Sequence, residues 1–169
     1  MAKRHPSHYL DIGVLGEDLV AQWLQSTSWM ILHRRWRCRW GEIDIIARKE
    51  PEKHSSPLLA FVEVKTRSRG NWDADGLLSI TSQKQAKLRQ TAQCFLAAYP
   101  KFADSPCQFD VALVHCQQLA RNELHPSSET PVKLEAATDL SSLPEQPVTT
   151  KIVAGYQLIL QEYIPSAFG

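Results

Sequence analysis

The apolar positions of the chain repeat in two different periods. Between Ile12 and Trp23, large apolar residues recur every three or four positions, the spacing of one face of a helix. Asp11 precedes this stripe directly, and its carboxylate can accept hydrogen bonds from the free N–H groups of a first helical turn. The pattern predicts an amphipathic helix that begins at Asp11.

A second helical period covers residues 82–99. Its buried face is predicted to consist of five residues: Leu88, Ala92, Phe95, Leu96 and Tyr99. Ser82 and Gln85 have the spacing of a capping box at the helix start.

The remaining apolar segments have the length and composition of strands. Residues 30–39 begin as a strand, and residues 43–47 and 58–66 form an expected antiparallel pair joined by the polar link at 52–57. Residues 108–115 and 151–164 follow, with a bend at Gly155 that predicts two short strands or a bulge. Asp110 near the start of its strand is expected to be a structural pairing acid.

Taken together, helices and strands predict one α/β domain with a mixed β-sheet flanked by helices. Residues 1–10 are a predicted flexible basic tail. Residues 117–150 are rich in Ser, Pro, Glu and Thr and predict a surface insertion, with a short strand at Val132–Glu135.

The composition of the chain indicates the cellular compartment in which the protein is expected. The N-terminus lacks the apolar core of a signal peptide, and no apolar run approaches the ~20 residues of a membrane helix. The four cysteines are scattered, without a C-x-x-C pair, which predicts free thiols in a reducing cytoplasm. We expect no membrane partner.

Charge is unevenly distributed, although the net charge is only +1. Residues 1–101 carry 16 Lys and Arg against 10 Asp and Glu, whereas residues 102–169 carry 3 against 8. A basic half suits a polyanionic partner.

Basic residues concentrate in two segments. Arg34, Arg35 and Arg37 follow one another without an acid, interleaved with tryptophans that could stack on unpaired bases. An edge strand protected by charge is the alternative reading. Lys84 and Lys87 oppose the dipole of the second helix at its start, which suggests phosphate contact, a remote acidic partner or a solvated face.

Acids interrupt two of the most apolar strands. Asp44 lies between isoleucines, and Glu63 and Lys65 lie among Phe61, Val62 and Val64. Glu63 and Lys65 are two residues apart and share a strand face. Charges in a buried strand are unfavourable by several kcal/mol unless they are paired, and a divalent metal with a phosphate would pair them.

Glu17 falls at the edge of the first helix's apolar stripe, while Asp18 should turn to solvent. A metal site would use Asp44 and Glu63 as oxygen ligands for Mg²⁺ or Mn²⁺, with Glu17 completing the shell. Lys65 would orient water or neutralise charge on phosphate. The alternative is an ion-pair network in which Lys65 neutralises Glu63 or Asp44 and Glu17 is solvated.

These residues resemble a known family pattern. The segments GEDLVA at 16–21, GEIDIIA at 41–47 and FVEVKTR at 61–67 are similar to those of the PD-(D/E)-x-K nuclease superfamily, and more closely to the YraN-like family of bacterial proteins. QFDV at 108–111 and SAF at 166–168 continue the resemblance.

The resemblance implies a restriction-endonuclease-like fold related to archaeal Holliday junction resolvases, with Glu17, Asp44, Glu63 and Lys65 as the catalytic set. It departs from the family pattern after Arg67, at Gln108 and in the insertion.

We therefore expect a metal-dependent endonuclease that hydrolyses DNA phosphodiester bonds, with branched DNA as a substrate class and a homodimer as its assembly. Six basic residues are candidates for nucleic-acid contact: Arg34, Arg35, Arg37, Arg67, Lys84 and Lys87. Two rival expectations are a non-catalytic nucleic-acid-binding protein and a protein-interaction module on the same fold.

Overall fold

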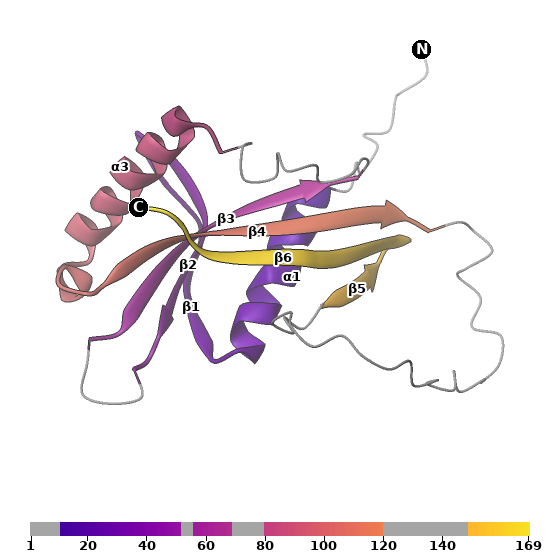
Figure 1. The fold of residues 1–169 in the computed structure, drawn as a ribbon, viewed down its shortest axis with the longest axis horizontal. Helices are drawn as coiled ribbons and strands as arrows, with labels where there is room; N and C mark the ends of the chain where they lie inside the picture. Colours follow the sequence, from indigo (N-terminus) through magenta and orange to yellow (C-terminus); the bar gives the residue numbers. More distant parts are fainter. Residues whose placement is uncertain (1–10, 52–55, 69–79, 120–148) are drawn as a thin grey trace, which may run out of the picture.

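Six strands form one mixed sheet in the order β1-β2-β3-β4-β6-β5 (Figure 1). The computed structural model describes residues 11–51, 56–68, 80–119 and 149–169. All neighbouring strands are antiparallel except β3 and β4, which are parallel. The strands are β1 (Trp29–Cys38), β2 (Gly41–Lys49), β3 (Leu58–Arg67), β4 (Cys107–Gln118), β5 (Thr150–Val153) and β6 (Tyr156–Phe168). The predicted mixed α/β architecture is confirmed.

Two α-helices of the described chain, α1 (Ile12–Ser26) and α3 (Ser82–Ala98), cover opposite faces of this sheet (Figure 1). The alternation of side chains along β3 explains the two layers. Val62 packs in the cluster that contains α1, whereas its neighbour Phe61 packs in the cluster that contains α3. A short 3-10 turn, η1 (Pro100–Phe102), follows α3.

The two helix starts differ in how well the sequence predicted them. Asp11 Oδ1 accepts hydrogen bonds from the N–H groups of Gly13 (3.0 Å) and Val14 (3.4 Å), so the predicted cap of α1 is confirmed. The capping box predicted at Ser82 is wrong by one residue. Thr81 is the cap and accepts from the Lys84 N–H at 3.2 Å.

The expected hairpin of β2 and β3 is confirmed, with Ile45 opposite Val62 and Lys49 opposite Leu58. The bend at Gly155 separates two strands, as one of the two predictions had it, although β6 has 13 residues and is not short. Ala154 and Gly155 both have positive φ, +50° and +80°, as a tight hairpin turn requires.

The predicted surface insertion overlaps the sheet at both ends. β4 continues through Gln118, and β5 begins at Thr150. Residues 120–148, with the strand expected at Val132–Glu135, and the predicted tail at 1–10 lie outside the described residues. None of the helices in the described ranges is long and apolar enough to cross a membrane.

Asp110 on β4 forms side-chain hydrogen bonds with residues of β6, the last strand of the chain. Its carboxylate is fully buried and accepts hydrogen bonds from the Tyr163 hydroxyl (2.5 Å), Gln108 Nε2 (2.9 Å) and the Ser166 N–H (2.9 Å). Burial and the adjacent Asp110 charge raise the pKa of Tyr163, so the phenol stays a donor. The expectation that Asp110 is a structural acid agrees with these contacts.

Candidate metal and phosphate site

The alternation of side chains in β2 is broken at Asp44. Ile43 and Ile46 are three residues apart, yet both are buried in the layer of α3, whereas Ile45 is buried in the layer of α1. Residues three apart in a regular strand face opposite sides. One additional residue is therefore accommodated between Ile43 and Ile45, and that residue is Asp44.

The neighbouring strand has a matching irregularity at Arg35. The ladder pairs Arg34 with Ile45 and Trp36 with Ile43, which leaves Arg35 at the level of Asp44. Arg35 has φ of +50°, a left-handed conformation that is uncommon for a residue with a side chain and that is enriched at functional sites.

The Asp44 side chain points toward β3 and accepts a backbone hydrogen bond where the pairing of β2 with β3 ends. Beyond the pair of Ile45 and Val62 the β2–β3 ladder ends, and Asp44 Oδ2 accepts the hydrogen bond of the Val64 N–H at 2.8 Å. Burial, and next the charge of Glu63, raise the pKa of Asp44 to about 7. Two carboxylates therefore lie close together with too little positive charge and too few donors around Asp44 to keep it ionised as usual.

Glu63 is buried at 4% exposure and faces the same layer as Phe61. Its Oε1 lies 2.8 Å from Lys65 Nζ and 3.1 Å from Lys84 Nζ, while its Oε2 is buried and has no hydrogen-bond partner. The predicted shared face of Glu63 and Lys65 is confirmed. Lys84 brings a second cation from the start of α3, so the remote acidic partner expected for it is Glu63.

Glu17 reaches this region from the opposite layer. The alternative that Glu17 is a solvated helix acid is wrong, because the residue is only 6% exposed. The helix can lie this close because Gly16 has no side chain: a Cβ there would fall 1.9 Å from Thr66 Oγ1. Burial raises the pKa of Glu17 against the opposing effect of Arg35, and the Glu17 charge in turn raises the pKa of Asp44.

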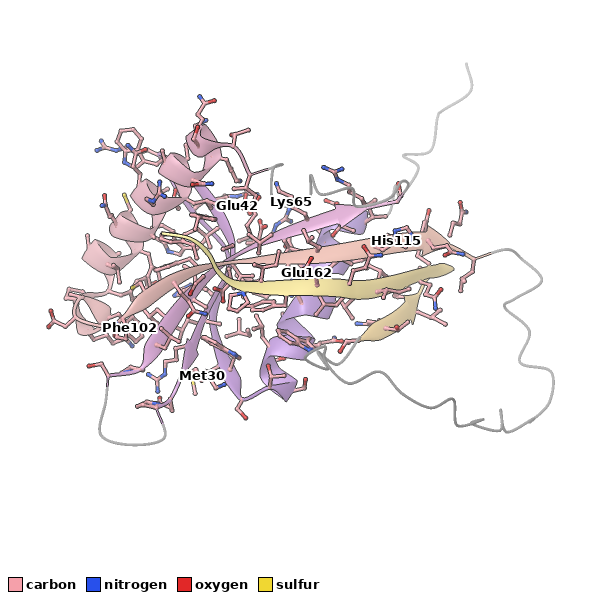
Figure 2. The ribbon with its side chains drawn as sticks, viewed as in Figure 1. Met30, Glu42, Lys65, Phe102, His115 and Glu162 are labelled. Atoms are coloured by element: carbon pink, nitrogen blue, oxygen red, sulfur yellow. The ribbon has the colours of Figure 1, made fainter. Side chains whose placement is uncertain are left out.

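The arginines of β1 are held by acids. Arg35 Nε lies 3.4 Å from Glu17 Oε2 and 3.3 Å from Glu42 Oε1, and Arg37 Nε lies 2.7 Å from Glu42 Oε2. Glu42 is therefore a half-buried partner of two arginines, because the hairpin brings the ends of β1 and β2 together. Figure 2 shows Glu42 and Lys65 at one end of the strands and Met30 at the other.

Asp18 also differs from expectation. It was expected to turn to solvent, but its side chain is 35% exposed and its Oδ1 lies 2.6 Å from Arg34 Nη1. β1 is an edge strand of the sheet, and Trp36 is half-buried against α3 while Trp40 is exposed. The edge position of this segment is confirmed, acids of α1 and β2 pair with Arg34, Arg35 and Arg37, and contact with nucleic acid stays a prediction.

The structure thus brings Asp44, Glu63, Lys65 and Lys84 together, with Glu17 and Arg35 on their border. Lys87 is exposed on α3, and Arg67 is exposed at the end of β3. Across the described ranges, no three His, Cys, Asp or Glu side chains converge closely enough to hold a metal among themselves.

The donor set nevertheless fits a hard divalent cation bound by few protein ligands. Mg²⁺ is commonly held by one or two carboxylates together with water and substrate phosphate. Glu63 Oε2 is buried without a hydrogen-bond partner, and burial together with the charge of Glu63 raises the pKa of Asp44. A cation between Asp44 and Glu63 would satisfy both, and no third carboxylate is required.

Sequence reasoning missed two contributors to this region. Glu42 is absent from the predicted site residues, because its strand position alone gives no sign of Arg35's left-handed turn. The approach of Gly16 to Thr66 was also missed, because a glycine in a helix permits close contact without indicating which residue makes it.

Comparison with known proteins places the chain in a family. The model described as "Uncharacterised protein family UPF0102" matches residues 16–114, which include Glu17, Asp44, Glu63 and Lys65. A UPF0102 protein of Trichodesmium erythraeum (strain IMS101) is 49% identical over 168 residues, covering 96% of this chain and 91% of the relative.

Two further relatives match over nearly their full length. A UPF0102 protein of Trichormus variabilis (strain ATCC 29413 / PCC 7937) is 51% identical and covers 95% of each chain. The UPF0102 protein sll0189 of Synechocystis sp. (strain ATCC 27184 / PCC 6803 / Kazusa) is 42% identical and covers 94% of this chain and 98% of the relative. With a family match over more than half of its length and relatives of this similarity, the chain belongs to the UPF0102 family.

Proposed function

We propose that this protein is a metal-dependent endonuclease of the PD-(D/E)-x-K superfamily, with a restriction-endonuclease-like fold, that hydrolyses phosphodiester bonds of DNA. One observation carries the proposal: the half-buried Asp44, whose pKa is raised by burial and by the charge of Glu63, lies beside the buried Glu63, whose Oε2 has no hydrogen-bond partner and whose Oε1 faces two lysines. A structural ion pair needs neither the break in β2 nor the raised pKa of Asp44.

A Mg²⁺ or Mn²⁺ ion bound there would polarise the scissile phosphate and make water a better nucleophile. Asp44 and Glu63 would hold the cation, and the Val64 N–H keeps the Asp44 carboxylate in one orientation. Lys65 and Lys84 are placed to neutralise negative charge on the phosphate once the cation replaces them at Glu63. Glu17 would accept a hydrogen bond from water at the rim.

Substrate contact would come from cations that border the acids. Arg34, Arg35 and Arg37 lie along the end of β1 nearest to Asp44, but their carboxylate partners must release them before they can bind phosphate. Arg67, Lys84 and Lys87 would extend this contact along β3 and α3. Branched DNA, a homodimer and a cytoplasmic location complete the proposal.

The decisive experiment incubates linear, flapped and four-way DNA with the protein and Mn²⁺. Wild type is compared with Asp44→Asn, Glu63→Gln and Lys65→Ala. Asp18→Asn is the matched control, because it removes a carboxylate of the same network that lies outside the proposed site. We expect cleavage by wild type and by the control, and loss in the other three.

Cleavage that persists in Glu63→Gln and Lys65→Ala would show a contaminating nuclease and overturn the proposal. The second candidate is a non-catalytic DNA-binding protein, and the engagement of Glu63 by Lys65 and Lys84 favours it, because a carboxylate already bonded to two cations can be purely structural. It predicts salt-dependent DNA binding without cleavage and without Mn²⁺ binding. If the protein binds neither DNA nor Mn²⁺, the protein-interaction module is the remaining candidate.

A further inference from the structure

Two cysteines that are far apart in the sequence meet where the edge strand touches α3. Cys38 is the last residue of β1 and pairs with Gly41 across the β1–β2 hairpin. A Cβ on Gly41 would lie 3.4 Å from Thr91 Oγ1 of α3. Cys94 lies three residues beyond Thr91, on the same side of that helix.

The side chains of Cys38 and Cys94 are neighbours in this contact, and each is among the groups that shift the pKa of the other. Both cysteines are free and half-buried, so they are held in place yet reachable by a small reagent. Cys107 and Cys116 differ from them. Cys107 is exposed at the start of β4, and Cys116 is fully buried near the end of the same strand.

The two neighbouring thiols have unlike surroundings. The Trp40 N–H donates to Cys38 Sγ at 3.4 Å, and the Thr91 and Cys94 side chains lie beside this sulfur as further polar neighbours. Burial raises the pKa of Cys38, but these polar neighbours together outweigh it and lower the pKa. Burial and the Cys38 contact raise the pKa of Cys94. The Cys38 sulfur is therefore suited to attack a disulfide first as a thiolate, and the Cys94 sulfur is suited to attack Cys38 in the second step.

We propose that Cys38 and Cys94 form a reversible disulfide that covalently joins β1 to α3, with low-molecular-weight disulfides such as oxidised glutathione as the oxidant class. The Cys38 thiolate attacks one sulfur of oxidised glutathione, forms a mixed disulfide and releases one glutathione thiolate. The Cys94 thiolate, after loss of its proton to water, attacks the Cys38 sulfur and releases the second. Two protein thiols lose two electrons in total, and one glutathione disulfide gains them.

This bond would tie together the two elements that flank the acids. β1 carries Arg35, and α3 carries Lys84, so the disulfide would fix the spacing between two cations of the region. The inference does not depend on the proposed function, because it concerns bond formation between two sulfurs and not the reaction at Asp44 and Glu63.

The test equilibrates the reduced full-length protein with a series of glutathione redox buffers, blocks free thiols with N-ethylmaleimide and maps the digest by mass spectrometry. We expect a Cys38–Cys94 linked peptide pair, a fall from four free thiols to two in the unfolded protein, and full reversal by dithiothreitol. Cys107→Ser is the matched control and should form the same link.

Cys38→Ser and Cys94→Ser should each abolish the link, and Cys94→Ser should retain glutathione on Cys38. Because the wild-type digest decides the question directly, a variant that fails to fold does not blur the result. Glutathione on Cys38 or Cys94 of the wild type without a linked pair would overturn the proposal. So would oxidation confined to dimers joined through Cys107, or four thiols that remain free in the most oxidising buffer.

Discussion

Two acidic regions of one sheet, around Asp44 on β2 and Asp110 on β4 with β3 between them, differ in what surrounds them. Asp110 on β4 is fully buried and accepts three hydrogen bonds. Asp44 on β2 is half-buried and accepts one backbone hydrogen bond beside a second carboxylate, and its pKa rises to about 7. The two carboxylates therefore differ most in the number of hydrogen bonds that protein groups donate to them.

The number of hydrogen bonds that a carboxylate still lacks therefore indicates a binding role better than its burial does. A carboxylate whose lone pairs are filled by protein donors is part of the scaffold, and replacing it should unfold the molecule. A carboxylate that is buried with too few donors destabilises the folded state on its own, and it gains only when a cation arrives.

The largest difference should appear in catalysis. Glu63→Gln keeps the shape of the side chain but removes a charge that would hold the cation, so we expect metal-dependent DNA cleavage to fall about a thousandfold, a change of roughly 4 kcal/mol in the barrier. Asp110→Asn, assayed at a temperature where it is folded, should stay within about tenfold of wild type. Single-turnover cleavage rates measure the activity of both variants. Similar losses of activity in the two variants would contradict the assignment of Glu63 to catalysis and of Asp110 to structure.

Stability should respond in the reverse order. Asp110→Ala leaves the Tyr163 hydroxyl, the Gln108 amide and the Ser166 N–H without their acceptor. We expect the free energy of unfolding to fall by roughly 3–5 kcal/mol, because each buried unpaired group costs about 1–3 kcal/mol. Urea denaturation measures this. A loss below about 1 kcal/mol would mean that water replaces the carboxylate and that Asp110 is not a structural acid.

The pH dependence of the metal-free protein should identify Asp44. A carboxyl whose folded pKa is about 7, against 3.8 normally, binds more protons in the folded than in the unfolded state between those values. Stability therefore falls as pH rises through this window, and the loss is complete above pH 7.

Asp44→Asn removes that titration and should be more stable than wild type at pH 8 by roughly 2–3 kcal/mol, with little difference at pH 4. Its amide oxygen can still accept the Val64 N–H. Thermal unfolding in the presence of a chelator at several pH values tests this. If wild type and Asp44→Asn lose stability in parallel between pH 5 and pH 8, another group is responsible.

The smallest effect concerns the third acid. Gly16→Ala would place a Cβ against Thr66 Oγ1, so α1 must move away from β3, at a loss of about 1–2 kcal/mol. Because α1 carries Glu17, we also expect Mn²⁺ affinity to fall. Combining it with Thr66→Ala should recover most of the stability, since the methyl group occupies the vacated space. Calorimetry of Mn²⁺ binding and thermal unfolding follow the two effects separately.

The sequence predicted the elements well because their patterns are local. The apolar period of α1 and its Asp11 cap, the hairpin of β2 and β3, and the shared face of Glu63 and Lys65 depend on residues close in the chain. The nuclease reading depends on the same residues and stays a prediction.

What the sequence did not predict depends on contacts between distant segments. Glu17 is buried because Gly16 admits Thr66, and Glu42 leaves solvent because Arg35 adopts a left-handed conformation. The cap at Thr81 was missed because Ser82 beside it offers the same hydroxyl one residue later. The meeting of Cys38 and Cys94 had no sequence signal, since β1 and α3 are joined only by packing.

The paired irregularity of Arg35 and Asp44 has a consequence for how such a sheet can change over time. Removing both residues together would leave Trp36 and Ile43 opposite each other and return the isoleucines of β2 to strict alternation. A chain shortened in this way should form a regular β1–β2 hairpin. Under the proposed function, a matched deletion of two facing residues would remove the site, and a matched insertion would restore it.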